Sequence, residues 1–421
     1  MFNRKILLAI YIFYIVFISL SSFLFAFLFQ KKFYVMDVNH NIILENITFE
    51  FGELIKNLFY SGEYFSVINN VKFQLMKLPA IPLLLLFICK ISLNYFFVVI
   101  FKNIITFSLY FLFSYFLTKD FKNKILFFLI LIVPIIIPYS FSVALNYVYE
   151  DNLIALLLPL LFLSLVSENK NRLVYSGVIL FLLYFVKTSM FLLVAIIPFL
   201  IIFFEKKIRI FLRLFPLLMS ILAIIIWGYF GYSHTGRFPF GSAWASNNSY
   251  VLSYALNKQF KNYYPDRSTD LIPIFKSDRE FKSEWEFYDY YKLQNKNYLK
   301  SNFSSYLKDI SLKLNFIFFG VHVDGINVNN NELINKPIRY SSILSKFFLN
   351  LAILISTYIL IKNYKNFLNY RKELYFIVIF FLNLTPHLIG WATSKHLIAI
   401  CNISLIYLIF YLKKRMYANN I

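Results

Sequence analysis

The sequence predicts an all-α membrane protein, a bundle of about ten spanning helices with interfacial helices in two outer loops. Three observations support this prediction. Apolar residues make up 59% of the 421 residues and charged residues only 15%, too few to cover the surface of a soluble protein of this length. Uncharged apolar runs recur along the chain at lengths that suit a bilayer. Basic clusters lie at the ends of these runs and share one predicted face.

The first part of the chain, 1–230, is expected to form a transmembrane core with one outer loop. Its first helix covers 6–29, because the uncharged stretch after two basic residues is too long for a signal-peptide core. The polar segment 30–77 is rich in acidic residues and is placed outside. The apolar run 78–89 holds two prolines and is too short to span, so an interfacial or re-entrant helix on the outer side is predicted.

The remaining helices are placed by apolar length and oriented by the excess of Lys and Arg in cytoplasmic loops. They are expected at 95–117, 125–141, 153–166, 173–186, 190–204, 210–230, 342–361, 374–389 and 397–412. A large outer region, 231–341, precedes the C-terminal helices of 342–421, and the apolar piece 312–321 is expected to dip into the outer leaflet. The basic connections then share the cytoplasmic face with the N-terminus.

The net charge of +21 does not indicate a nucleic-acid binder. Such proteins gather Lys and Arg on one water-facing surface, whereas here the basic clusters follow apolar runs. Cys89 and Cys401 each lie in an apolar run, far apart in the sequence. Neither a disulfide framework nor a zinc site is expected from this spacing.

Two carboxylates stand at the predicted outer membrane surface. Glu150 and Asp151 lie where the helix 153–166 begins. Acidic residues favour helix N-termini, so the pair can be read as a simple helix start. It can also be read as a site that moves a proton or binds a divalent cation, Mg²⁺ or Mn²⁺.

Several cations are expected on the same outer face. Lys187 ends a helix there, against the charge rule, either as a snorkelling side chain or as a cation for an anion such as a lipid phosphate. Further basic groups on this face are His234, Arg237, His387, Lys395 and His396, although a lone histidine is more often structural. Together these residues suit an enzyme in which a carboxylate deprotonates an acceptor hydroxyl while cations or a metal stabilise a departing phosphate.

The order of several short motifs is informative. A Ser-Gly-Glu-Tyr step at 61–64 precedes a Leu-Pro-Ala-Ile-Pro-Leu segment at 78–83. An acidic pair then begins a helix, Lys187-Thr188 ends the next one, and Lys395-His396 precedes the last. In this order the chain resembles the membrane glycosyltransferases of the GT-C fold, which include lipid A aminoarabinose transferases and protein O-mannosyltransferases.

The resemblance implies transfer of a sugar from a polyprenyl-phosphate donor to a glycan, lipid or protein acceptor, on the periplasmic side of a bacterial inner membrane. It also implies a catalytic carboxylate in the first outer loop. The usual aspartate of the family is missing near Phe51, so Asp37, Glu45 or Glu50 would have to serve, with Glu50 nearest the Gly62 step. A polysaccharide polymerase or ligase is the main alternative. A lipid-linked glycan transporter is a weaker one, because no internal repeat is evident.

Overall fold

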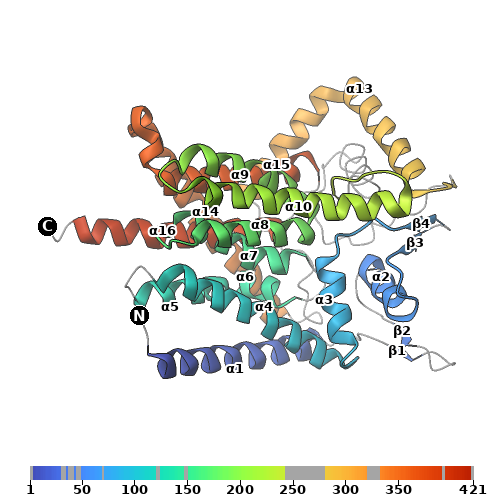
Figure 1. The fold of residues 1–421 in the computed structure, drawn as a ribbon, viewed down its shortest axis with the longest axis horizontal. Coiled ribbons are helices and arrows are strands. Elements are labelled where there is room, and N and C mark those ends of the chain that lie inside the picture. Colours follow the sequence, from blue (N-terminus) through green and yellow to red (C-terminus); the bar gives the residue numbers. More distant parts are fainter. Residues whose placement is uncertain are drawn as a thin grey trace.

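The computed structural model is predominantly helical, and its helices run roughly along one direction (Figure 1). It describes residues 3–29, 35–36, 42–43, 49–68, 71–119, 124–146, 150–241, 280–319, 332–390 and 394–418. Figure 1 shows both chain termini at one end of the bundle and the short strands at the opposite end. A helix is found at each of the ten positions that the sequence predicts to span.

The N-terminal part contains one long helix, two short antiparallel strand pairs and a shorter helix between them. Its elements are α1 (Arg4–Phe29), β1 (Val35–Met36), β2 (Ile42–Ile43), α2 (Phe49–Tyr60), β3 (Ser66–Ile68) and β4 (Val71–Phe73). Strand β1 pairs antiparallel with β2, and β3 pairs antiparallel with β4, with Ser66 opposite Phe73. The short apolar helix α3 (Ala80–Cys89) follows, at the place predicted for a re-entrant helix.

Apolar helices form the rest of the bundle. They are α4 (Tyr95–Thr118), α5 (Lys124–Ile136), α6 (Pro138–Leu145), α7 (Asp151–Val166), α8 (Arg172–Val186), η2 (Thr188–Met190), α9 (Phe191–Phe204) and α10 (Ile210–Thr235). The C-terminal part adds α13 (Glu284–Phe319), α14 (Glu332–Lys362), η5 (Tyr364–Asn369), α15 (Arg371–Ile389), η6 (Ser394–Leu397) and α16 (Ile398–Ala418).

Two predicted elements differ from the structure. One continuous helix was expected over 125–141, but α5 and α6 meet at a bend of 80°. Pro138 lies at the start of α6, where its missing N–H and its ring prevent α5 from continuing through it. The outer region was expected to fold into short helices, whereas α13 consists of two longer helical segments that meet at a kink at Asn302, where the backbone is not helical.

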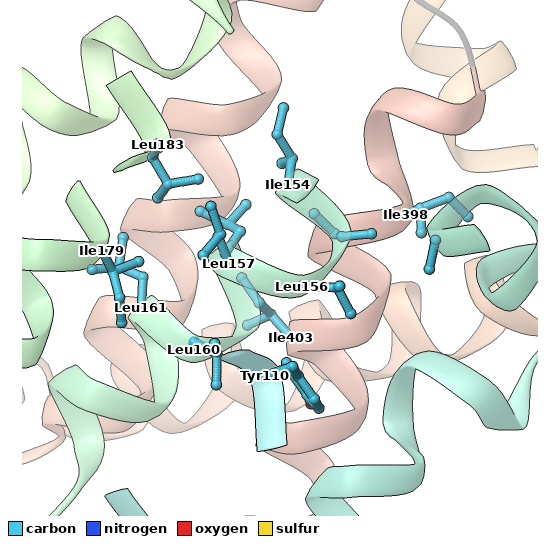
Figure 2. Close-up of a cluster of buried hydrophobic side chains, with 14 of the residues drawn as sticks. Tyr110, Ile154, Leu156, Leu157, Leu160, Leu161, Ile179, Leu183, Ile398 and Ile403 are labelled. Atoms are coloured by element: carbon cyan, nitrogen blue, oxygen red, sulfur yellow. The ribbon is translucent and has the colours of Figure 1, made fainter. Parts of the chain in front are cut away.

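Helix α7 lies at the centre of the bundle. Every residue of α7 except Leu153 is buried, and a helix that is apolar on all sides can be stable only inside such a core. Figure 2 shows its side chains between neighbours from three other helices, α4, α8 and α16. The residues labelled there are Tyr110, Ile154, Leu156, Leu157, Leu160, Leu161, Ile179, Leu183, Ile398 and Ile403.

Five helices are long and apolar enough to cross a membrane: α1, α4, α10, α14 from Lys336 onward, and α15. The bent pair of α5 and α6 would make a sixth, and further apolar helices are shorter. Helix α1 presents exposed apolar side chains such as Phe13 and Leu20 along its length. Exposed apolar surface of this extent is costly in water and expected in lipid, so the chain is consistent with a helical membrane protein.

A buried charge cluster joins four elements at the end of the bundle that carries the termini. Glu205, after α9, accepts hydrogen bonds from Arg172 at the start of α8 and from Arg371 at the start of α15. The Tyr375 hydroxyl also donates to Glu205, at 3.3 Å. The two guanidinium groups also donate to carbonyls at the C-terminal end of α7, at Leu165 and Val166. One carboxylate and a helix C-terminus thus stabilise the buried guanidinium of Arg172 and the partly exposed guanidinium of Arg371.

A second buried carboxylate lies at the end of the bundle that carries the short strands (Figure 1). Glu284 of α13 accepts a hydrogen bond from the backbone N–H of Leu75, at 3.1 Å. Around it, an apolar cluster packs α13 against the β3–β4 hairpin, formed by Val71, Phe73, Met76, Phe281 and Phe287. Helix α13 therefore docks on the first outer loop through apolar contacts and one carboxylate.

Replacing Glu205 with Gln should destabilise the fold by about 3–5 kcal/mol, because the guanidinium groups of Arg172 and Arg371 would lose their carboxylate. Thermal unfolding of purified protein in detergent measures the effect. Glu168→Gln is the control, since Glu168 is an exposed carboxylate at the same end of α7. Equal stability of the two variants would contradict a structural role for the cluster.

Docking of α13 should weaken as the pH rises. Burial raises the pKa of Glu284 from 4.5 to about 7, although backbone N–H groups of Leu75 and Gln74 favour the ionised form. A raised pKa in the folded state means that the docked form binds the proton more tightly. Its contribution to stability is therefore full below pH 4.5 and is lost as the pH rises through about 7.

Hydrogen exchange at the Leu75 amide, corrected for its intrinsic pH dependence, should show less protection above pH 7 than below it. The variant Glu284→Gln keeps an acceptor oxygen but does not titrate, so its protection should be independent of pH. A wild-type protein with constant protection across this range would rule out the effect.

Candidate functional site

The candidate site lies at the N-terminal end of α7. Asp151 is the first residue of α7, where the positive end of the helix dipole favours a carboxylate, and Glu150 precedes it. Lys187 ends α8, and His396 lies in the short helix η6 before α16. About 22 Å of α7, at 1.5 Å per residue, separates this cluster from the Glu205 cluster at the opposite end.

An ion pair forms the centre of the site. The Lys187 Nζ lies 2.9 Å from Asp151 Oδ1 and 3.1 Å from Oδ2. The His396 Nε2 lies 4.0 Å from Asp151 Oδ2, so the carboxylate faces two basic groups. The side chains of Asp151 and His396 are 7% and 9% exposed, and that of Lys187 is 17% exposed. The low exposure makes these charges interact more strongly than they would in water.

The first outer loop reaches the same site through Lys77. The Nζ of Lys77 lies 3.9 Å from Glu150 Oε1, and its backbone carbonyl accepts a hydrogen bond from the Tyr64 hydroxyl at 2.7 Å. Burial raises the pKa of Tyr64 well above 10.0, and the Glu150 carboxylate raises it further. Tyr64 therefore stays a neutral hydrogen-bond donor that fixes the end of the loop. The Lys77 contact joins the first outer loop to the Glu150–Asp151 pair.

Helix α15 contributes a second histidine. The ring of His387 stacks on that of His396, with centroids 4.2 Å apart. The end of α15 is held by Lys313 of α13, whose ammonium donates to the carbonyls of Leu388 and Gly390 at 2.9 and 2.7 Å. The outer helix α13 thus supports the histidine side of the site.

A buried lysine fixes the connection that leads to Glu150. Lys102 of α4 is 1% exposed and donates to the carbonyls of Ala144, Leu145 and Asn146, at 3.0–3.4 Å. These carbonyls end α6, where the helix dipole favours a cation. The Asn146 carbonyl also accepts from the side chain of Asn152 in α7. Lys102 therefore caps the C-terminal end of α6.

The predicted site residues fall into two groups. Glu150, Asp151, Lys187 and His396 come together as described. The other predicted residues either lie elsewhere or have side chains that the structure does not describe. They are Arg237, His234, Glu50, Lys395, Asp37 and Glu45.

Arg237 pairs with Asp289 at 2.9 Å, and its guanidinium carbon lies 5.0 Å from the Trp285 ring centroid. His234 contacts its helical neighbours Ser233 and Phe230. His234 lies in the last turn of α10, and Arg237 follows directly after the end of that helix.

Glu50 lies in α2 and Lys395 in η6, but the structure does not describe their side chains. Asp37 and Glu45 lie outside the described residues. The catalytic role of the three loop carboxylates stays a prediction.

Lys77 and Tyr64 were not predicted as members of the site, whereas His387 was predicted among the basic groups of this face. Lys77 was recognised only as the end of the first outer loop, and Tyr64 only as part of the Ser-Gly-Glu-Tyr motif. The one available signal was that Lys77 lies at a predicted boundary of the loop. That signal does not show which boundaries meet in space.

A divalent cation at Glu150 and Asp151 stays a prediction that this arrangement fits poorly. The Asp151 carboxylate already contacts the Lys187 ammonium with both oxygens. Within the described residues, no group of three or more His, Cys, Asp or Glu side chains is arranged to hold a metal ion. We therefore assign no chemical step to a metal here.

Comparison of the chain with protein-family models, with curated proteins and with solved structures finds no match. The described fold defines a predominantly helical protein with several candidate membrane spans. Any more specific function has to be argued from the chemistry of the site itself.

The Asp151–Lys187 pair should be strongly coupled. Asp151→Asn and Lys187→Met each leave one charge with little exposure and without its partner, so each should cost about 3–5 kcal/mol of stability. The double variant should cost less than the sum of the two, because it removes both charges. Thermal unfolding of the four proteins gives the coupling energy.

The pair Lys72–Glu63 provides a matched control, since both side chains are about half exposed, at 47% and 57%. Its cycle should show much weaker coupling, because solvent screens an exposed pair. Additive effects at Asp151 and Lys187 would show that their ion pair does not contribute to the fold.

Proposed function

We propose that the protein is a membrane glycosyltransferase of the GT-C type. It would transfer a sugar from a polyprenyl-phosphate donor to a glycan, lipid or protein acceptor. The observation that carries the proposal is the convergence of Glu150, Asp151, Lys187 and His396 at one end of the bundle, beside the end of the first outer loop. Carboxylates and cations at a membrane surface suit chemistry on a lipid phosphate.

The orientation that supports this function follows from the distribution of charge. The connection after α9 carries Lys206, Lys207 and Arg209, and Arg213 follows in the first turn of α10, at the end that holds the Glu205 cluster. An excess of Lys and Arg favours the cytoplasmic side. The candidate site, at the opposite end of α7, would then face the periplasm of a bacterial inner membrane.

About ten spans agree with this orientation. The bent pair α5–α6 and the shorter apolar helices α7, α8, α9 and α16 would complete the set with the five longer helices. Helix α7 packs inside the bundle, so its 16 residues need not match the thickness of the surrounding lipid. Ten crossings return the C-terminus to the side of the N-terminus, as in Figure 1.

The residues of the site would have different roles in the reaction. The acceptor hydroxyl oxygen forms a bond to the anomeric carbon of the sugar, and the bond from that carbon to the phosphate oxygen breaks. The hydroxyl proton passes to a carboxylate, and the polyprenyl phosphate leaves with the bonding electrons. Lys187 and His396 would stabilise the charge on this phosphate.

Glu150 suits the role of base better than Asp151. The Asp151 carboxylate contacts the Lys187 ammonium at 2.9 and 3.1 Å, whereas the Lys77 ammonium lies 3.9 Å from Glu150. A carboxylate held by a short ion pair is a weaker base. Asp151 would instead position Lys187 for the phosphate. The carboxylates of the first outer loop, with Glu50 favoured over Asp37 and Glu45, are the other candidates for the base.

Sugar transfer from a polyprenyl-phosphate donor, measured in membranes, tests the proposal. Glu150→Gln and Lys187→Met should reduce transfer by about 10²–10⁴-fold, the usual contribution of a general base or a comparable charge. Asp151→Asn, Glu50→Gln and Asp37→Asn test the remaining carboxylates. Glu63→Gln is the matched control, because Glu63 is an exposed carboxylate of the first outer loop.

The outcomes separate the alternatives. If every carboxylate variant, like Glu63→Gln, transfers sugar as the wild type does, the carboxylate mechanism is wrong. Growth of long polymers from lipid-linked oligomers would identify a polymerase or ligase. Movement of a lipid-linked glycan across vesicles without a new glycosidic bond would identify a transporter.

A further inference from the structure

Helix α13 leaves the bundle between two anchored ends. Its N-terminal end is held by Glu284 and Phe287 on the first outer loop, and its C-terminal end by Lys313 at the end of α15. Figure 1 shows the segment between them arching away from the side of the bundle. The arch, residues 292–312, is bent at Asn302, where the backbone is not helical.

The arch exposes large apolar side chains. Leu293, Phe303, Leu307 and Leu312 are 55%, 58%, 51% and 42% exposed. Phe303 and Leu307 are four residues apart, so they lie on the same face of the second half of the helix. Apolar side chains gathered on one projecting segment indicate a surface that is covered by a partner.

The charge of the arch indicates what covers it. Lys292, Lys296, Lys300 and Lys308 are all exposed, and the sequence of the arch contains one acidic residue, Asp309. Lysines can place their ammonium groups among phosphates while their methylene chains accompany apolar neighbours into lipid. A helix with exposed apolar residues and lysines is typical of segments that lie in the headgroup layer of a membrane.

The place of the arch also favours lipid over a protein partner. Both of its ends are fixed to a bundle whose neighbouring helices expose apolar surface. Ile221 and Ile225 of α10 and Phe347 and Leu354 of α14 are 44–68% exposed, as expected of lipid-facing positions. The arch therefore continues an apolar surface that faces the bilayer.

We propose that the arch of α13 is a membrane-surface anchor: Phe303 and Leu307 enter the boundary between headgroups and acyl chains, and the four lysines bind anionic lipid headgroups. The anchor does not depend on the proposed glycosyl transfer. The anchor would hold the outer loops, and the end of α15 that carries His387, at a fixed depth relative to the bilayer.

Site-specific labelling tests the anchor. Cys89 and Cys401 are both buried, so an environment-sensitive thiol fluorophore should react with an introduced cysteine, and labelled wild type gives the background. Phe303→Cys and Leu307→Cys report on the arch. Glu63→Cys reports on a water-exposed loop, and Leu354→Cys on a lipid-facing position. The full chain is reconstituted in vesicles of phosphatidylcholine with and without phosphatidylglycerol.

Labels at 303 and 307 should emit at shorter wavelength than the label at 63. They should be quenched by brominated lipid, as at 354, and be protected from aqueous iodide. Replacing all four lysines with Gln should remove the additional protection that phosphatidylglycerol gives. Since these lysines are exposed, the label at 354 should be unchanged and confirm a folded bundle.

Two results would overturn the proposal. In the first, labels at 303 and 307 are as accessible to iodide as the label at 63. In the second, Phe303→Cys proteins form disulfide-linked dimers in vesicles and the label is shielded only in the dimer, which would make the arch an interface between copies of the chain.

Discussion

The structure depends on a central helix whose surroundings are mainly apolar, with buried hydrogen bonds such as those from Asn402 to the Ala155 carbonyl and between Ser164 and Ser176. Between Asp151 and Val166, α7 is enclosed by apolar side chains from its neighbours. A charge placed midway along it would lack both water and a partner, at a high cost in free energy. Charged side chains that meet α7 are therefore found at its two ends, and each end has become a point where several helices are joined.

The two ends use opposite charges for the same physical reason. The carbonyls at the C-terminal end of α7 accept from Arg172 and Arg371, which Glu205 also binds. At the N-terminal end, Asp151 suits the positive end of the helix dipole and in turn fixes Lys187. In the first cluster, the charged groups pair with one another. The second meets Lys77 from the first outer loop and His396 from the connection before α16, and it is the end where we propose the chemistry.

Helix α13 connects the outer segments to the N-terminal end of α7. Glu284 of α13 binds the backbone of Leu75, two residues before Lys77, and Lys313 binds the carbonyls that follow His387. One helix therefore contacts the segments that bring both Lys77 and the histidines to the site. A change in how α13 lies on the membrane would be transmitted to these residues through short, defined contacts.

The sequence by itself determined where the helices lie and which ends share a face. Long apolar runs report burial or lipid contact directly, and Lys187 stood out because a lysine on the outer side needs a reason. Even the bend before α6 has a local cause in Pro138. Only the tertiary structure decided that Lys187 meets Asp151, that Lys77 meets Glu150, and that Glu205 joins two arginines. These pairs are separated by tens of residues or more, and apolar periodicity does not specify which helices become neighbours in a bundle.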